Sequence, residues 1–297
     1  MVINLNTYNF EIPYLKGRTH LVLDPVALPG DIRKWFINDH CIFTGPDGKL
    51  HFFGINNPFP EDMTHLYRIH RYITHAVADT PTGGFEICGF ALEDETWLGA
   101  PAVQWCADKK KFVMLLQSDI AGIRGQELAF SKDLYSWQRT GVPVLENIGI
   151  DMRDPCFVAL DNGNTGILLA TTQDQKNSCV LLVETKNFDT FTEPVNLFSI
   201  ADNVPWGGIE SPFLYFHKEL WYLFFTYAHH QYYETRVLVS DTPYHFKCEN
   251  QITTLFGHAS EIFAFNGKEY ITNCGPGDAQ VLNEHALYVT ELCWLKP

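Results

Sequence analysis

The chain has 297 residues, of which 46% are hydrophobic and 19% charged, so it is globular and long enough for one large domain. Acidic residues outnumber basic ones by 35 to 21, which gives a net charge of −14 and argues against a nucleic-acid partner. No apolar run approaches the length that would span a bilayer, so no membrane partner is expected.

The first 30 residues carry no obvious repeat. They begin "MVINLNTYNFEIPYLKG", without the basic and then apolar pattern of a signal peptide, and we expect a cytoplasmic protein. The segment 1–30 is expected to pack on the rest of the chain, either against its outside or as a strand that completes its last repeat.

Five later segments share one plan, in which a short apolar strand, a polar turn and a second apolar strand follow one another. They read "NDHCIFTGPDGKLHFFG", "GAPAVQWCADKKKFVMLL", "RDPCFVALDNGNTGILLA", "IESPFLYFHKELWYLFF" and "HASEIFAFNGKEYITN". Asp-Gly and Asn-Gly in the turns tolerate the positive φ that tight hairpins require. The second strands begin near Lys49, Lys111, Gly166, Glu219 and Lys268, which are 49 to 62 residues apart.

Each unit continues into a third strand and a polar, aromatic-ended fourth region, as in "RVLVSDTPYHFKCEN". Units of three to four strands at this pitch are typical of β-propeller blades, which stack around an axis because no blade buries both of its faces alone. The sequence therefore predicts an all-β fold, a single-domain five-bladed β-propeller over residues 31–297.

Acidic residues stand at equivalent places where the units begin. Asp39 opens the first unit, Asp154 the third and Glu210 the fourth, while the fifth has His258 and Glu261. Because the first strand of each blade lines the axis, these carboxylates are expected to meet at one end of it. Three acids in one pocket repel one another, and at least one should hold its proton near neutral pH. This arrangement suits acid/base chemistry on an acetal, although each acid by itself could simply cap a turn.

"NDHCIFTGPDGKLHFFG", "MRDPCFV" and "GIESPFLYFHKELWYLFF" resemble the three signature blocks of the five-bladed propeller glycoside hydrolases. That superfamily includes arabinanases, β-xylosidases, α-arabinofuranosidases, invertases and levansucrases. The resemblance runs from about Lys34 to the C-terminus. The sequence departs from the invertase pattern after Asn38-Asp39, where His40-Cys41 follow. It also has Ser211 between Glu210 and Pro212, where the family usually has Cys or Gly.

The resemblance implies a role for each acid. Asp39 matches the first-blade acid, which is a general base in the arabinanase group and the nucleophile in the invertase group. Asp154 matches the third-blade acid, which holds sugar hydroxyls and tunes the proton donor. Glu210 matches the general acid. His258 matches a fifth-blade histidine that faces a metal ion or water on the axis in some relatives, so a structural calcium ion there is a possibility, alongside a purely structural histidine.

Six further residues are candidates for substrate binding because they adjoin the acids or the starts of the units: Asn38, His40, Trp105, Arg153, Trp206 and His258. The tryptophans, with Trp35, could stack on sugar faces, although core packing is the usual role of propeller aromatics. Arg153 could keep its neighbour Asp154 ionised.

The sequence thus predicts a glycoside hydrolase that releases a terminal furanoside or xylose-like sugar from small oligosaccharides, with no required cofactor. A transglycosidase or phosphorylase on the same fold is an alternative, but a phosphorylase needs a basic phosphate cradle, and only Arg153 adjoins an acid. A non-catalytic sugar-binding propeller is the third hypothesis, because fold does not imply function. The oligomeric state is not predicted.

Overall fold

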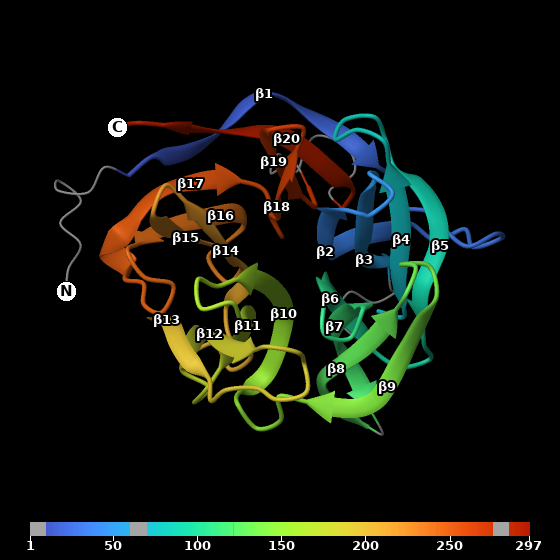
Figure 1. Cartoon of the computed structure of the whole chain (residues 1–297), viewed down its shortest axis with the longest axis horizontal. Helices are drawn as coiled ribbons and strands as arrows, with labels where there is room; N and C mark the ends of the chain where they lie inside the picture. The colour runs from blue at the N-terminus through green and yellow to red at the C-terminus, as the bar shows by residue number, and fades with distance from the viewer. Residues whose placement is uncertain (1–9, 60–69, 121, 276–284) are drawn as a thin grey trace.

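The computed structural model describes residues 10–59, 70–120, 122–275 and 285–297. Its strands form five antiparallel sheets of four strands each, arranged around a common axis (Figure 1). The expected all-β, five-bladed propeller is therefore confirmed. No helix in the described part of the chain is long and apolar enough to cross a membrane.

In the first four blades the strands follow one another in chain order from the axis outward (Figure 1). Blade I contains β2 (Trp35–Thr44), β3 (Leu50–Pro58), β4 (Tyr72–Ala78) and β5 (Glu86–Glu93). Blade II contains β6 (Leu98–Cys106), β7 (Lys111–Ile120), β8 (Ile123–Ser131) and β9 (Trp137–Val144). Blade III contains β10 (Ile150–Ala159), β11 (Thr165–Thr172), β12 (Asn177–Thr185) and β13 (Val195–Ala201). Blade IV contains β14 (Ile209–His217), β15 (Leu220–Tyr227), β16 (Gln231–Ser240) and β17 (Gln251–Phe256), with the 3-10 turn η2 (Cys248–Asn250) before its last strand.

Blade V joins the two ends of the chain. Its strands are β18 (Ile262–Phe265), β19 (Lys268–Asn273) and β20 (Leu287–Leu295), and the N-terminal strand β1 (Ile12–Leu23) pairs antiparallel with β20 on the outside. Within the segment 1–30, residues 12–23 thus form the outermost strand of the last blade. This pairing closes the ring of blades and leaves β20 without a free edge.

In blades IV and V, both residues of the turn between the first and second strands have positive φ, as the Asn-Gly signal predicted for blade V. In blade IV, the two-residue loop Lys218–Glu219 has φ of 46° and 67°, and in blade V the loop Asn266–Gly267 has φ of 49° and 76°. Positive φ at both positions is the requirement of a tight type I′ hairpin.

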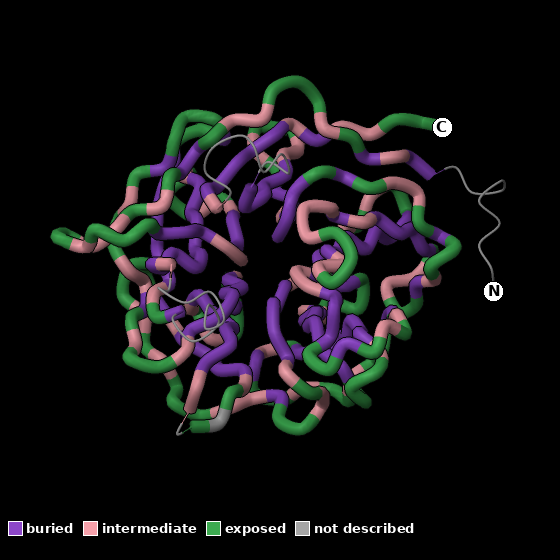
Figure 2. Tube along the Cα trace, turned by 180° about the vertical axis from the view of Figure 1, so that it is seen from behind, coloured by how far each residue is buried: buried purple, intermediate pink, exposed green. Residues whose placement is uncertain are grey.

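Apolar side chains are buried between neighbouring blades, so the buried positions lie inside the ring and the exposed ones on its loops and outer strands (Figure 2). Strand β15, "LWYLFFTY", is buried over all but its last residue. The second strand of a blade has neighbouring blades packed against both of its faces. This burial explains the near-continuous apolar run in that unit.

The innermost strands share an irregularity at the same height. The register of the first strand against the second shifts at Asn38–Asp39 in blade I, Gly99–Ala100 in blade II, Asp154–Pro155 in blade III and Ser211–Pro212 in blade IV. Asp154 and Ser211 also have positive φ, of 53° and 49°. A bulge leaves residues unpaired and re-aims their side chains, and polar residues occupy these positions in three of the blades: Asp39 in blade I, Asp154 in blade III and Ser211 in blade IV.

Closure of the ring can be tested with two leucines on β1. Leu23 is 5% exposed and packs between blades V and I, whereas Leu21 on the same strand is 45% exposed. We expect Leu23→Ala to lower the free energy of unfolding by roughly 2–5 kcal/mol, because it removes buried methyl groups and leaves a cavity. Leu21→Ala should change it by less than about 0.5 kcal/mol. Urea denaturation measures both, and equal effects would contradict the placement of β1.

Candidate active site

The bulges bring the carboxylates of three blades into one network. The Ser211 hydroxyl donates a hydrogen bond of 2.6 Å to Asp39 Oδ1, and the Ser211 backbone N–H donates one of 3.0 Å to Asp154 Oδ2. One residue of blade IV therefore holds the acids of blades I and III, while its neighbour Glu210 supplies the third. The sequence prediction that these acids meet at one end of the axis agrees with this geometry.

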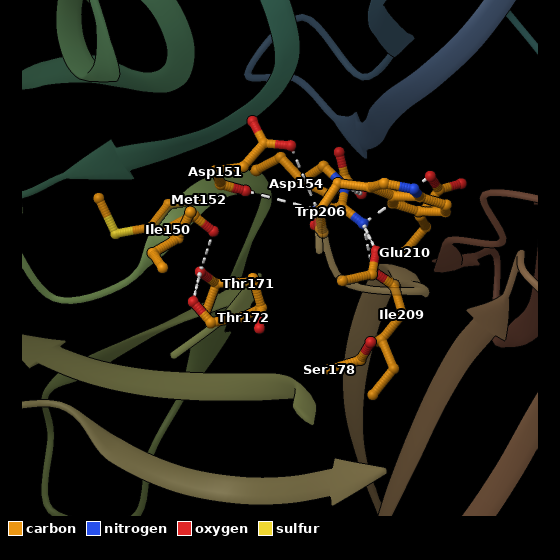
Figure 3. A network of polar contacts seen from close by, with 12 residues as sticks. Ile150, Asp151, Met152, Asp154, Thr171, Thr172, Ser178, Trp206, Ile209 and Glu210 are labelled. Atoms are coloured by element: carbon orange, nitrogen blue, oxygen red, sulfur yellow. Dashed lines mark hydrogen bonds and ion pairs between the residues drawn. The ribbon is translucent and has the colours of Figure 1, made fainter. Parts of the chain in front are cut away.

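Trp206, Ile209 and Glu210, in and just before β14, lie close to Asp154 of blade III (Figure 3), and Arg153 joins the two segments. Its guanidinium donates to the carbonyl oxygens of Trp206, Gly207 and Ile209, at 2.8 Å for the first and last. Gly207 has φ of 80°, and a Cβ there would lie 2.9 Å from the carbonyl oxygen of Thr171, so only glycine fits. The arginine thus fixes the loop that leads into Glu210.

Arg153 is also an ionic partner of the acids. Its nitrogens lie 3.7 Å from Asp154 Oδ2, 3.8 Å from Glu210 Oε1 and 3.7 Å from Asp151 Oδ2. These distances exceed hydrogen-bond range, so the guanidinium acts on the carboxylates through its charge.

Burial raises the pKa of the Asp154 carboxyl well above its usual range, and the nearby Asp39 charge raises it further. Arg153 opposes this shift without cancelling it, which differs from our expectation that Arg153 keeps Asp154 ionised; the cost of desolvation outweighs an ion pair of 3.7 Å. Burial also raises the pKa of Glu210, against the opposing charges of Arg153 and His258. The pocket therefore favours protonated carboxyl groups, as a proton donor requires.

The acids line a cavity of about 610 Å³. Six of the predicted residues line it: Asn38, Asp39, Arg153, Asp154, Trp206 and Glu210. Trp105 lies elsewhere, half exposed and with its ring against Phe112, because it falls at the far end of its strand. Trp35 is buried, with its indole N–H bonded to Asp31.

The two predicted histidines lie behind the cavity. His40 is buried; its Nδ1 lies 3.1 Å from the Asn38 carbonyl oxygen and its Nε2 lies 2.7 Å from the Thr272 hydroxyl, and burial lowers its pKa to about 4. It therefore braces the bulge that carries Asp39.

His258 stacks on Tyr232 with ring centroids 3.9 Å apart, and its Nε2 lies 3.9 Å from Glu210 Oε2. Within the described ranges, no group of three or more His, Cys, Asp or Glu residues is placed to hold a metal ion. A structural calcium ion beside His258 stays a prediction; among the described residues, both ring nitrogens of this buried histidine are without a hydrogen-bond partner.

Glu261, which the repeat also marked, lies on the axis behind the acids. It shares a cavity of only about 10 Å³ with Asp39 and Asp154, and burial raises its pKa well above the usual range. This group borders the carboxylates but does not line the main cavity.

The cavity also contains residues that sequence reasoning missed, namely His70, Trp97, Gln117, Arg124, Asp151 and Tyr232. Asp151 lies three residues before Asp154 in "DMRDP", so its proximity to the acids was a signal in the sequence. The others come from second and third strands or from the segments just before β4 and β6, whose approach to the axis depends on how the blades pack.

No protein-family model matches the sequence, and no curated protein matches it. Solved structures do match it. The RS223 β-xylosidase aligns with a TM-score of 0.65 and 16% identity over 89% of this chain and 93% of that one. The GH43_1 enzyme from Xanthomonas citri, complexed with xylotriose, aligns with a TM-score of 0.64 and 13% identity over 88% and 89%. A mutant GH32 β-fructofuranosidase from Bombyx mori, in complex with sucrose, aligns with a TM-score of 0.68 and 18% identity over 93% of this chain and 62% of that one.

The chain has the fold of the five-bladed propeller glycoside hydrolases. The resemblance found in the sequence blocks is thereby supported by the whole three-dimensional arrangement. At identities of 13–18%, the likeness establishes the shared architecture, and the chemistry has to be argued from the cavity itself.

The raised pKa of Glu210 makes a prediction about stability. A carboxyl with a higher pKa in the folded than in the unfolded protein does not affect the free energy of unfolding at a pH where both states are protonated. As the pH rises from the unfolded pKa through the folded pKa, this carboxyl increasingly destabilises the folded protein. Glu210→Gln removes that cost, so the melting temperature of the variant minus that of wild type should increase from pH 4 to pH 9. Glu95→Gln, at a carboxyl 92% exposed, is the control. A difference for Glu210→Gln that stays constant with pH would contradict the raised pKa.

Proposed function

We propose that the protein is a glycoside hydrolase that removes a terminal sugar from small oligosaccharides in its axial cavity. The observation that carries the proposal is the linkage of Asp39, Asp154 and Glu210 through Ser211 and Arg153 at the wall of one cavity. Acetal hydrolysis requires a proton donor and a carboxylate on opposite sides of the bond that breaks. Blades I and IV supply one acid each from different sides of the axis.

In this proposal Glu210 is the proton donor. Its raised pKa keeps a proton available for the glycosidic oxygen, and the bond from that oxygen to the anomeric carbon breaks as the proton is transferred. Asp39 either accepts a proton from the attacking water or attacks the anomeric carbon itself. Asp154, buried and bonded to the Ser211 N–H, would position sugar hydroxyls, while the charge of Asp39 helps to keep Glu210 protonated.

The substrate class is proposed from the size and polarity of the cavity together with its structural neighbours. A volume of about 610 Å³ holds one or two sugar units. One neighbour is a β-xylosidase, another was solved with xylotriose and a third with sucrose. We therefore propose a terminal xylose-like or furanoside sugar as the unit that is released, in the cytoplasm and without an organic cofactor.

The charges of the cavity favour hydrolysis over phosphorolysis. Among the described residues that line it, four are carboxylic acids and two are arginines, and the Arg153 guanidinium already donates to four backbone carbonyls. The other lining arginine, Arg124, lies 3.8 Å from the Asp151 carboxylate, so neither arginine offers an unshared charge to a phosphate dianion.

The deciding experiment is hydrolysis of a panel of 4-nitrophenyl glycosides and short oligosaccharides by wild type and Glu210→Gln. We expect wild type to cleave at least one substrate and the variant to lose about 10²- to 10⁴-fold in kcat, because general acid catalysis contributes that much. The loss should be greatest for oligosaccharides, whose leaving groups need the proton most. A variant as fast as wild type would exclude Glu210 as the donor. A wild-type protein that binds these sugars and cleaves none of them would favour the sugar-binding alternative.

Ser211 offers a second test. Ser211→Ala removes the hydroxyl that orients Asp39 but keeps the backbone N–H on Asp154. We expect kcat to fall by about 10- to 150-fold, since a hydrogen bond to a charged group is worth roughly 1.5–3 kcal/mol, with little change in KM. Ser240→Ala, at a buried serine that bonds the His245 carbonyl oxygen in blade IV, is the control and should leave kcat unchanged. An equal effect of both variants would mean that only stability had changed.

A further inference from the structure

The mouth of the cavity carries a charged pair that the catalytic scheme does not use. Arg124 on β8 and Asp151 on β10 come from blades II and III, and their side chains are 3.8 Å apart. Both line the cavity. Within the described part of the chain, neither the Arg124 guanidinium nor the Asp151 carboxylate makes a side-chain hydrogen bond. Arg124 lies over the Trp97 ring, and Asp151 lies 3.7 Å from Arg153.

The pair lies nearer to the solvent than the acids do. The Arg124 and Asp151 side chains are 36% and 32% exposed, compared with 10% for Asp154 and 22% for Glu210. A terminal sugar that reaches the buried acids must therefore pass these residues, and the remainder of an oligosaccharide extends back toward them.

The Arg124 side chain is positioned by its neighbours. The Arg124 guanidinium stacks over the Trp97 ring at 4.4 Å, and the Trp97 indole N–H donates to Gln117, which is buried and bonded in turn to the Met152 carbonyl oxygen. Asp151 has φ of 51°, a backbone strain that natural proteins keep mostly where function needs it. Arginine fixed in this way loses little entropy when it binds a ligand.

On the basis of the proposed function, we propose that Arg124 and Asp151 form the site for the second sugar unit, the one that leaves, and so set the preference of the enzyme for oligosaccharides over simple glycosides. The guanidinium can donate hydrogen bonds to hydroxyl oxygens and the carboxylate can accept them from hydroxyl groups, so the pair matches adjacent hydroxyls of a neutral sugar. Trp206, which is 42% exposed beside Glu210, offers the apolar face against which that sugar can stack.

The ligand is a neutral sugar and not an acidic one. Asp151 lies beside Arg124 at 3.8 Å and also 3.7 Å from Arg153, so any anion at Arg124 would approach a carboxylate.

The test measures binding, so that it does not depend on turnover. In an Asp39→Asn background, calorimetric titrations compare xylose with xylotriose and fructose with sucrose. We expect the longer sugar of at least one pair to bind more tightly than its monosaccharide. Adding Arg124→Ala should lower the affinity for the longer sugar by about tenfold or more and change the affinity for the monosaccharide by less than about twofold. The reason is that only the second sugar unit loses a charge-assisted hydrogen bond.

Two further variants complete the design. Asp151→Asn should also lower the affinity for the longer sugar selectively. Lys16→Ala is the control: it breaks an exposed ion pair between β1 and Glu291 of β20, and it should leave both affinities unchanged. Urea denaturation of each variant verifies that it is folded.

An equal loss of affinity for both sugars would place Arg124 and Asp151 at the terminal sugar and overturn the inference. Unchanged affinities would also overturn it, as would a background protein that binds neither pair of sugars. A wild-type protein that shows the expected binding pattern but cleaves nothing would refute the proposed hydrolysis and leave the second-sugar site standing.

Discussion

The cavity depends on the two hydrogen bonds by which Ser211 joins the carboxylates of Asp39 and Asp154. Carboxylates crowded at one end of an axis repel one another and lose solvation, so without donors they would turn away or force the strands apart. A hydroxyl and an N–H from a single bulged residue satisfy one acid each. The middle residue of Glu210-Ser211-Pro212, at which this chain departs from the usual pattern, is therefore the one that ties three blades together.

Arg153 is the complementary element. A buried guanidinium is costly unless its donors are satisfied, and here three carbonyl oxygens of the Trp206–Ile209 segment satisfy them. The charge that remains is directed at Asp154 and Glu210 from just beyond hydrogen-bond distance. The arginine moderates the raised pKa values of both acids and at the same time fixes the loop on which Glu210 stands.

The polarity of the cavity changes with depth. Near the axis, the acids stand among buried groups, with Ile55 and Ala100 in the wall. Toward the mouth, Arg124, Asp151 and Trp206 are all substantially exposed. Desolvation at the inner end favours proton transfer, whereas the exposed outer end offers groups that can exchange water for hydroxyls at little cost. This division suits a substrate that reacts at its end and is recognised along its length.

The sequence by itself determined the class of fold, the number of blades and the three acids. Hairpin turns such as Asn266–Gly267 and the spacing of the units are local signals, and a repeat converts positions distant in the chain into neighbours on one axis. The tertiary structure decided which other side chains reach that axis. Trp105 and Arg124 both belong to blade II, but strand direction and the bulges carry the first away from the cavity and bring the second into its wall. Such placements depend on how neighbouring blades pack, which the order of residues along one strand does not specify. For the same reason, the role of Ser211 emerged only in three dimensions, because its partners lie in blades I and III.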